Sequence, residues 1–116
     1  MFKWEDFISV SEDLLKNSKE NEAYFRTIIN RAYYGAFCTA RDKASFEKDK
    51  SKSIHQIVKN FYLHSEDQEK KLVGKMLAQL LKFRKAADYE LNCWDCTKNK
   101  ATFAVLMAQD IIEELK

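Results

Sequence analysis

The sequence contains no proline and only two glycines among its 116 residues. Sandwiches and barrels need many tight turns, and tight turns depend on these two residue types. Their scarcity argues against an all-β fold and favours long helices joined by short polar connections. Because this length suits one hydrophobic core, we expect a single domain over residues 1–116.

Cysteine is also scarce, and long apolar runs are missing. The three cysteines are an odd number and lack the density of a disulfide-stabilised secreted scaffold. No run approaches the roughly 20 apolar residues of a membrane span, and the N-terminus has no apolar segment of signal-peptide length. We therefore predict a cytoplasmic protein without membrane spans. The net charge of +2 does not indicate a strongly basic nucleic-acid module, but it is compatible with a local basic groove.

Apolar residues recur at helical spacing in five segments, which predicts an all-α bundle of mostly antiparallel helices. The expected helices span 4–16, 19–43, 54–63 and 66–91, and a fifth ends at Lys116. The expected N-terminal caps are Ser18, Ser53, Ser65 and either Asp95 or Thr97. In the last three helices the residues expected to face the core are Ile54, Ile57, Val58 and Phe61; Leu72, Val73, Met76, Leu77, Leu80, Leu81, Ala87 and Leu91; and Phe103, Leu106, Met107, Ile111 and Leu115. The long polar connection at 44–52 is either a solvated linker or a basic flap over a site.

The stretch at 29–41, INRAYYGAFCTAR, lies in the middle of the second expected helix and is apolar on nearly every side. Such a helix must be covered by neighbours all round. It nevertheless carries Arg31 and Tyr34. Since arginine is rarely fully buried without a partner, Arg31 must either meet a carboxylate or lie at the rim of a groove.

A second polar set lies near the end of the fourth expected helix. Arg84 and Asp88 are four residues apart and share a helix face, and Tyr89 follows directly. Alone, this pattern would indicate an ordinary ion pair. Together with Arg31 and Tyr34, it predicts a groove lined by guanidinium and phenol groups. Such a groove suits RNA, because arginine binds phosphate through two hydrogen bonds and tyrosine stacks on bases.

Cys93 and Cys96 have the spacing of half a zinc site or of a redox pair. A structural zinc site needs four ligands, and the sequence offers no second cysteine pair. It also lacks the strand–helix context of a thioredoxin-type site. We therefore expect both cysteines to be small apolar fillers at a helix junction, and we predict neither a metal nor a cofactor.

These motifs resemble the HEPN superfamily of small helical domains, in the branch with an Arg-Ala-Tyr-Tyr-x-Ala-Phe helix and a later Arg-x-x-Ala-Asp-Tyr helix. The likeness extends over residues 22–112, and both motifs occur in the expected order. The matching residues are Asn30, Arg31, Ala32, Tyr33, Tyr34, Ala36, Phe37, Ala40 and Arg41; His55, Val58 and Phe61; and Leu80, Leu81, Arg84, Ala87, Asp88 and Tyr89.

The resemblance implies a homodimer, or a dimer with a related domain. Many members of the superfamily are metal-independent ribonucleases of toxin–antitoxin, abortive-infection or CRISPR-linked systems. Others bind RNA without cleaving it or partner a small nucleotidyltransferase, which raises the question of whether a tyrosine such as Tyr89 is modified.

Active members use an arginine followed a few residues later by a histidine. Arg84 matches that arginine, but Asp88 or Tyr89 stands where the histidine would be. A tyrosine with an ordinary pKa of ~10 is a poor general base at neutral pH. His55 could reach the groove from the third helix, or it could only cap or pack there.

Three hypotheses follow. The first is a HEPN-type protein of a toxin–antitoxin or defence system that binds RNA or a partner as a dimer and has a degenerate ribonuclease motif. The second is a metal-independent endoribonuclease toxin in which Arg31 and Arg84 stabilise the phosphate and His55 or Tyr89 moves protons. The third is a helical protein–protein interaction module in which Arg31 and Arg84 only form ion pairs.

Overall fold

The computed structural model describes residues 1–17, 20–46 and 51–116, and these residues form five α-helices and no strand. The helices are α1 (Asp6–Asn17), α2 (Glu22–Lys43), α3 (Ile54–Leu63), α4 (Gln68–Tyr89) and α5 (Lys98–Glu114). The predicted all-α bundle is confirmed. Among the described residues, no helix is long and apolar enough to cross a membrane.

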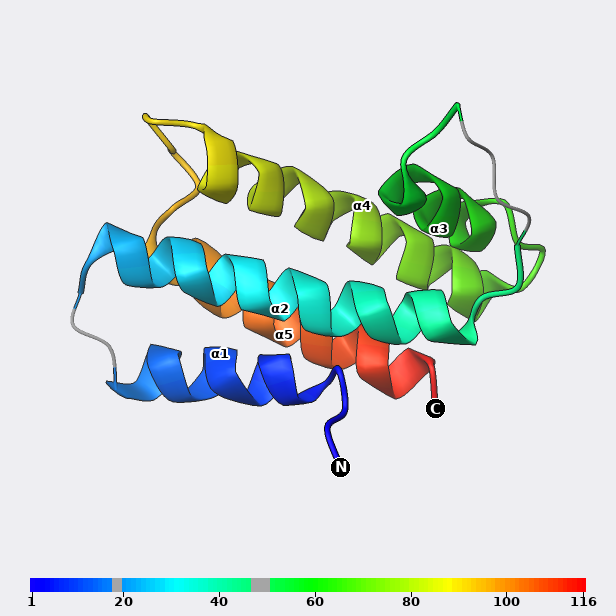
Figure 1. The fold of residues 1–116 in the computed structure, drawn as a ribbon, viewed down its shortest axis with the longest axis horizontal. Coiled ribbons are helices and arrows are strands. Elements are labelled where there is room, and N and C mark those ends of the chain that lie inside the picture. Colours follow the sequence, from blue (N-terminus) through cyan, green and yellow to red (C-terminus); the bar gives the residue numbers. More distant parts are fainter. Residues whose placement is uncertain (18–19, 47–50) are drawn as a thin grey trace.

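α2 is the central helix of the bundle and contacts each of the other four (Figure 1). α1 and α4 lie on either side of it, α5 lies behind it in this view, and α3 packs against α4. The α1–α2 and α4–α5 connections lie at one end of the bundle, and both termini lie toward the other (Figure 1).

Small residues let the neighbouring helices approach α2 closely. Ala32, Ala36 and Ala40 are completely buried, and so are the larger Ile28 and Ile29. A Cβ atom on Gly35 would lie only 2.6 Å from Cγ1 of Ile8 in α1. The mixture of small and branched side chains therefore explains why a helix that is apolar on nearly every side can be covered all round.

The helix starts agree with the predicted caps in part. Ser53 caps α3 through Gln56 N, and Thr97 caps α5 through Lys100 N. α4 begins later than predicted, because Asp67 accepts hydrogen bonds from the amides of residues 69 and 70, whereas Ser65 accepts one from the Asp67 amide. α2 is capped by Asn21, and Ser18 lies outside the described residues.

Several residues predicted to face the core are exposed. α4 ends at Tyr89, so Leu91 belongs to the following connection. On α5 the buried residues Ala101, Ala104 and Ala108 define the inner face, and Phe103 and Leu106 lie on a different face. Ile54 and Leu72 are likewise exposed. The apolar periodicity predicted these helices correctly, but it was wrong about which of their faces pack against other helices.

The predicted polar connection is only partly described, since positions 47–50 lie outside the described residues. The choice between a linker and a flap therefore stays open.

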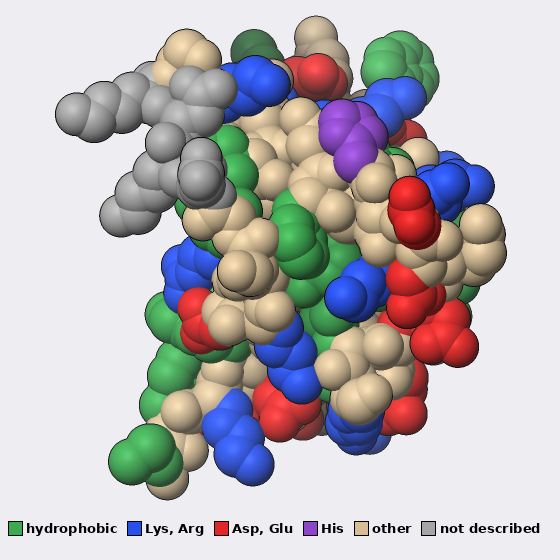
Figure 2. Space-filling model, turned by 90° about the vertical axis from the view of Figure 1, so that its right-hand side faces the viewer, with side chains coloured by type: hydrophobic (Ala, Val, Ile, Leu, Met, Phe, Trp, Pro, Cys, Tyr) green, Lys and Arg blue, Asp and Glu red, His purple; other side chains and the backbone are tan. Residues whose placement is uncertain are grey.

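On the face at the right-hand side of Figure 1, basic and acidic side chains are interspersed (Figure 2). The net charge of +2 is therefore not concentrated in one patch on that face.

Candidate functional site

Three helices bring a set of polar and aromatic side chains together on one side of the bundle. α2 contributes Tyr33 and Tyr34, α3 contributes His55, and α4 contributes Arg84. Hydrogen bonds link these residues across sequence separations of 22 and 50 positions. They meet because α3 packs against α4, and both contact α2. We call these four residues the Arg84 cluster.

Arg84 is the one charged residue in the described chain that is almost fully buried, with 7% of its surface exposed. Its Nη2 donates a hydrogen bond of 2.7 Å to Tyr34 Oη. Its Nε lies 3.3 Å from Oδ2 of Asp88, an ion-pair distance, but the N–H is not directed at that oxygen and finds no other acceptor among the described residues. The guanidinium also lies 5.2 to 5.8 Å from the ring centres of Tyr33, Tyr34 and Tyr89. Arg84 is thus paired, as a buried cation must be, but incompletely satisfied.

Asp88 lies directly beside Arg84 and is joined to Arg31 through the side-chain amide of Asn30. Asn30 Nδ2 donates to both carboxylate oxygens of Asp88 at 3.0 Å. The Oδ1 atom of Asn30 accepts from Nε and Nη2 of Arg31. Arg31 is half-buried and lies over the Phe7 ring at 4.6 Å. Of the two positions predicted for it, Arg31 therefore takes the rim of the site, where an amide bridges it to the carboxylate.

His55 lies inside the Arg84 cluster. Its Nδ1 is 2.7 Å from Tyr33 Oη, and its ring stacks on Phe37 with the ring centres 4.4 Å apart. Burial, with smaller contributions from the positive charges of Arg84 and Lys85, lowers the pKa of His55. Burial raises the pKa of Tyr33, so its phenol stays protonated. The result is a neutral imidazole joined to a neutral phenol, close to a fixed cation.

Tyr89 lies at the outer edge of the site. Its side chain is 76% exposed, although its ring centre is 5.8 Å from the Arg84 guanidinium. Lys85, one residue after Arg84, is exposed as well. A shallow pocket of about 150 Å³ lies beside Asp88 and is lined by Arg26, Thr27 and Asn30. The accessible part of the site thus contains an aromatic ring, an amide and a carboxylate, with the guanidinium behind them.

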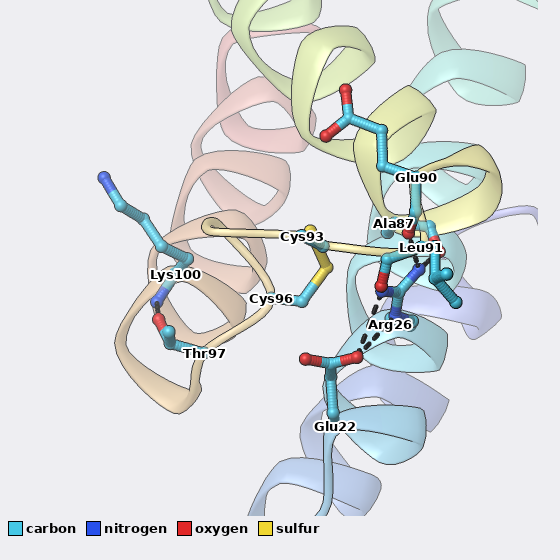
Figure 3. Close-up of a disulfide and its surroundings, with 9 residues drawn as sticks. All are labelled: Glu22, Arg26, Ala87, Glu90, Leu91, Cys93, Cys96, Thr97 and Lys100. Atoms are coloured by element: carbon cyan, nitrogen blue, oxygen red, sulfur yellow. Dashed lines mark hydrogen bonds and ion pairs between the residues drawn. A yellow bond between two sulfur atoms is a disulfide. The ribbon is translucent and has the colours of Figure 1, made fainter.

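A third arginine holds the end of α4 in place. Arg26 donates to the carbonyl oxygens of Ala87, Glu90 and Leu91 at 2.6 to 3.0 Å, and it pairs with Glu22 on its own helix (Figure 3). The last carbonyls of a helix have no partners within the helix, and α4 has no basic residue in its last turn. Arg26 supplies a partner from α2 to one of them, the carbonyl of Ala87, and also binds the carbonyls of Glu90 and Leu91 just past the helix end. It thereby fixes the segment that carries Asp88 and Tyr89.

Cys93 and Cys96 form a disulfide within the α4–α5 connection (Figure 3). The prediction of small apolar fillers at a helix junction is right about the place and about the burial of Cys96, but it did not include the bond between the two sulfurs. The two-residue gap allows their side chains to meet once the chain turns between two helices. No group of three or more residues able to hold a metal ion occurs in the described part of the chain.

The structure brings together most of the residues selected from the sequence, and it adds three others. Arg84, Asp88, Tyr34, His55 and Tyr89 lie in or beside the Arg84 cluster, and Arg31 joins through Asn30. The site residues missed were Tyr33, Asn30 and Arg26. Tyr33 and Asn30 belong to the quoted motif, so the motif itself was the available signal. Arg26 gave no sequence signal, because its partners are backbone carbonyls of another helix.

Comparison of the chain with protein-family models, with curated proteins and with solved structures finds no match.

Proposed function

We propose that this chain is a HEPN-type protein of a prokaryotic toxin–antitoxin or defence system that binds RNA and has a degenerate ribonuclease motif. The observation that carries the proposal is the Arg84 cluster. It joins the two motif helices through Arg84 and Tyr34, and no histidine follows Arg84 on α4. Burying a cation among phenol groups costs desolvation free energy that an apolar side chain at the same position would not, so stability alone does not account for Arg84.

The proposed binding mode uses groups that the site already orients. Arg84 would bind an RNA phosphate by exchanging its incomplete contact with Asp88 for two hydrogen bonds to phosphate oxygens. Asn30 would keep Asp88 hydrogen-bonded after the exchange, which lowers its cost. Exposed Tyr89 offers a face on which an unpaired base can stack. These features favour single-stranded RNA, whose bases are accessible, over duplex RNA.

Labelled single-stranded RNA incubated with the protein in EDTA tests both binding and cleavage. Native gels report binding, and denaturing gels report cleavage. The informative variant is Arg84→Met, and its control is Arg41→Met, which removes the same charge from a more exposed pair with Asp42. We expect intact RNA and a gel shift that weakens at least about tenfold in Arg84→Met but not in Arg41→Met. Equal binding by all three proteins would contradict the proposal and leave the interaction-module hypothesis.

The second candidate is a metal-independent endoribonuclease, and the position of His55 is the observation that favours it. If His55 Nδ1–H donates to Tyr33, then Nε2 has a free lone pair and can take the proton of an RNA 2′-hydroxyl. The resulting alkoxide would attack the neighbouring phosphorus and form a 2′,3′-cyclic phosphate. The 5′-oxygen would leave and take up a proton, while Arg84 stabilises the charged phosphorane.

Cleavage by clean wild-type protein in EDTA would support this second candidate over the first. It would then be lost in both Arg84→Met and His55→Gln, and expression in bacteria would arrest growth. If RNA stays intact and expression is harmless, the endoribonuclease candidate fails and the binding role is unaffected.

We also propose the partners and location that the resemblance suggests. These are a second copy of the chain or a nucleotidyltransferase-type antitoxin, in the cytoplasm. Disulfides are rare in a reducing cytoplasm. Thiol labelling of protein extracted under acid quench therefore tests the location. In that compartment we expect the disulfide of Cys93 and Cys96 to be reduced and both thiols to be labelled, and complete protection would contradict a reducing compartment.

A further inference from the structure

The disulfide of Cys93 and Cys96 lies within one short connection, the chain between α4 and α5 (Figure 3). A disulfide stabilises a fold chiefly by closing a long loop of the unfolded chain. This one joins residues that are only three positions apart, so it restricts the unfolded chain little and links no distant segments of the bundle. A role as a structural staple therefore does not account for it.

The two cysteines of this disulfide differ in exposure. Cys96 is 4% exposed and belongs to the buried core, whereas Cys93 is half-buried and lies between the exposed residues Asn92 and Trp94. A thiol in solution therefore reaches Cys93 first. Cys96 directly precedes Thr97, the N-cap of α5, and the start of a helix favours a negative charge. The arrangement suits attack on Cys93 with Cys96 as the leaving thiolate.

The chain that leaves α4 is held at two points (Figure 3). Arg26 of α2 donates to two carbonyls just past the helix end. A few residues further on, the disulfide ties Cys93 to a core residue. Asp88 and Tyr89 are the last residues of α4, so both points of attachment restrain the part of the helix that belongs to the candidate site.

We propose that Cys93 and Cys96 form a redox switch, in which a thiol reductant opens the disulfide and releases the end of α4. In the first step a thiolate of the reductant attacks Sγ of Cys93, the S–S bond breaks, and Cys96 leaves as a thiolate. A second reductant thiolate attacks the reductant's sulfur in the mixed disulfide and frees Cys93. The reductant departs as a disulfide, two electrons have passed to the protein, and both cysteine thiolates take up protons. The reverse exchange with a small disulfide closes the switch.

The released segment carries groups that the proposed RNA site uses. Tyr89 offers the exposed ring, and Asp88 lies beside Arg84. Reduction therefore lowers the affinity for single-stranded RNA at least about fivefold, because a mobile ring stacks less well on a base. This consequence rests on the proposed function, whereas the release of the helix end does not and is measured without RNA.

The exchange step is tested in buffers of reduced and oxidised glutathione, with the free thiols counted by labelling. We expect the disulfide-bonded share of the protein to fall steadily as the share of reduced glutathione rises. A structural disulfide resists reduction by glutathione. A Cys93–Cys96 bond that persists in a large excess of reduced glutathione therefore overturns the inference.

Hydrogen exchange followed by mass spectrometry tests the release. We expect amides in the last turn of α4 to exchange at least about tenfold faster in the reduced protein, while those of α1 keep their rates. Cys93→Ser cannot form the disulfide and should match the reduced protein with and without glutathione. It is the control for direct effects of the thiol, including any on the free Cys38. Unaltered exchange at the end of α4 overturns the inference, and so does faster exchange throughout the bundle.

RNA affinity, measured in both redox states, separates this inference from the proposed function. If the end of α4 responds to reduction but neither state binds RNA, the switch stands and the RNA-binding proposal fails. If RNA binds both states equally well, the claim that the switch acts on the candidate site is overturned.

Discussion

Replacing Arg84 with methionine removes the guanidinium but roughly conserves the side-chain volume. The lost hydrogen bond to Tyr34, 2.7 Å long and donated by a charged group, contributes about 1.5–3 kcal/mol to stability. The lost ion pair contributes less, because the Asp88 side chain is 23% exposed and keeps its two bonds from Asn30. We therefore expect Arg84→Met to lower the free energy of unfolding by about 2–4 kcal/mol.

Urea denaturation followed by circular dichroism measures this change. The control Arg41→Met should cost less than about 1 kcal/mol, because the Arg41 and Asp42 side chains are 33% and 53% exposed and the pair is screened by water. Combining Arg84→Met with Tyr34→Phe in a double-mutant cycle should give a coupling energy of about 1 kcal/mol or more. If Arg84→Met unfolds at the wild-type urea concentration, or if the coupling energy is near zero, the Arg84–Tyr34 contact is not the stabilising link described above.

Three further changes test other parts of the structure. Gly74→Ala should lower the free energy of unfolding by about 1–3 kcal/mol, since its Cβ would lie 2.5 Å from the backbone nitrogen of Leu63; a stabilised variant in the urea assay would contradict this close approach. The lowered pKa of His55 means that its contribution to stability is present above the ordinary value of ~6.5 and is lost as the pH falls below it. His55→Gln should therefore reduce the change in the urea midpoint between about pH 7 and pH 5.5. A variant whose midpoint depends on pH as steeply as that of wild type would contradict the lowered pKa of His55. Arg26→Met should speed amide hydrogen exchange in the last turn of α4, at least about tenfold, and unaltered exchange there would show that the carbonyl contacts are dispensable.

The helices were predictable because their signals are local. Ser53 and Thr97 cap helices through hydrogen bonds to residues three positions away, and buried alanines in α2 repeat at helical spacing. The faces of α4 and α5 were less predictable. Phe103 and Leu106 are as apolar as core residues, and only the positions of the other helices decide that this face stays half exposed, with Phe83 of α4 against one side of Phe103.

The candidate site was predictable where the motif is local and unpredictable where it depends on the packing of helices. The spacing of Arg84 and Asp88 was sufficient to predict their ion pair. The contact between His55 and Tyr33 depends on where α3 sits against α2, which no sequence spacing specifies. The disulfide of Cys93 and Cys96 likewise depends on the turn between α4 and α5.

The most direct test of the proposed function is the affinity for labelled single-stranded RNA in EDTA, measured by fluorescence anisotropy under conditions in which every variant is folded. Arg84→Lys keeps the charge but loses the planar fork that binds two phosphate oxygens. We expect affinity to fall in the order wild type, Arg84→Lys, Arg84→Met, with Arg41→Met close to wild type. Wild-type affinity in Arg84→Met would contradict the claim that the Arg84 cluster is an RNA-binding site.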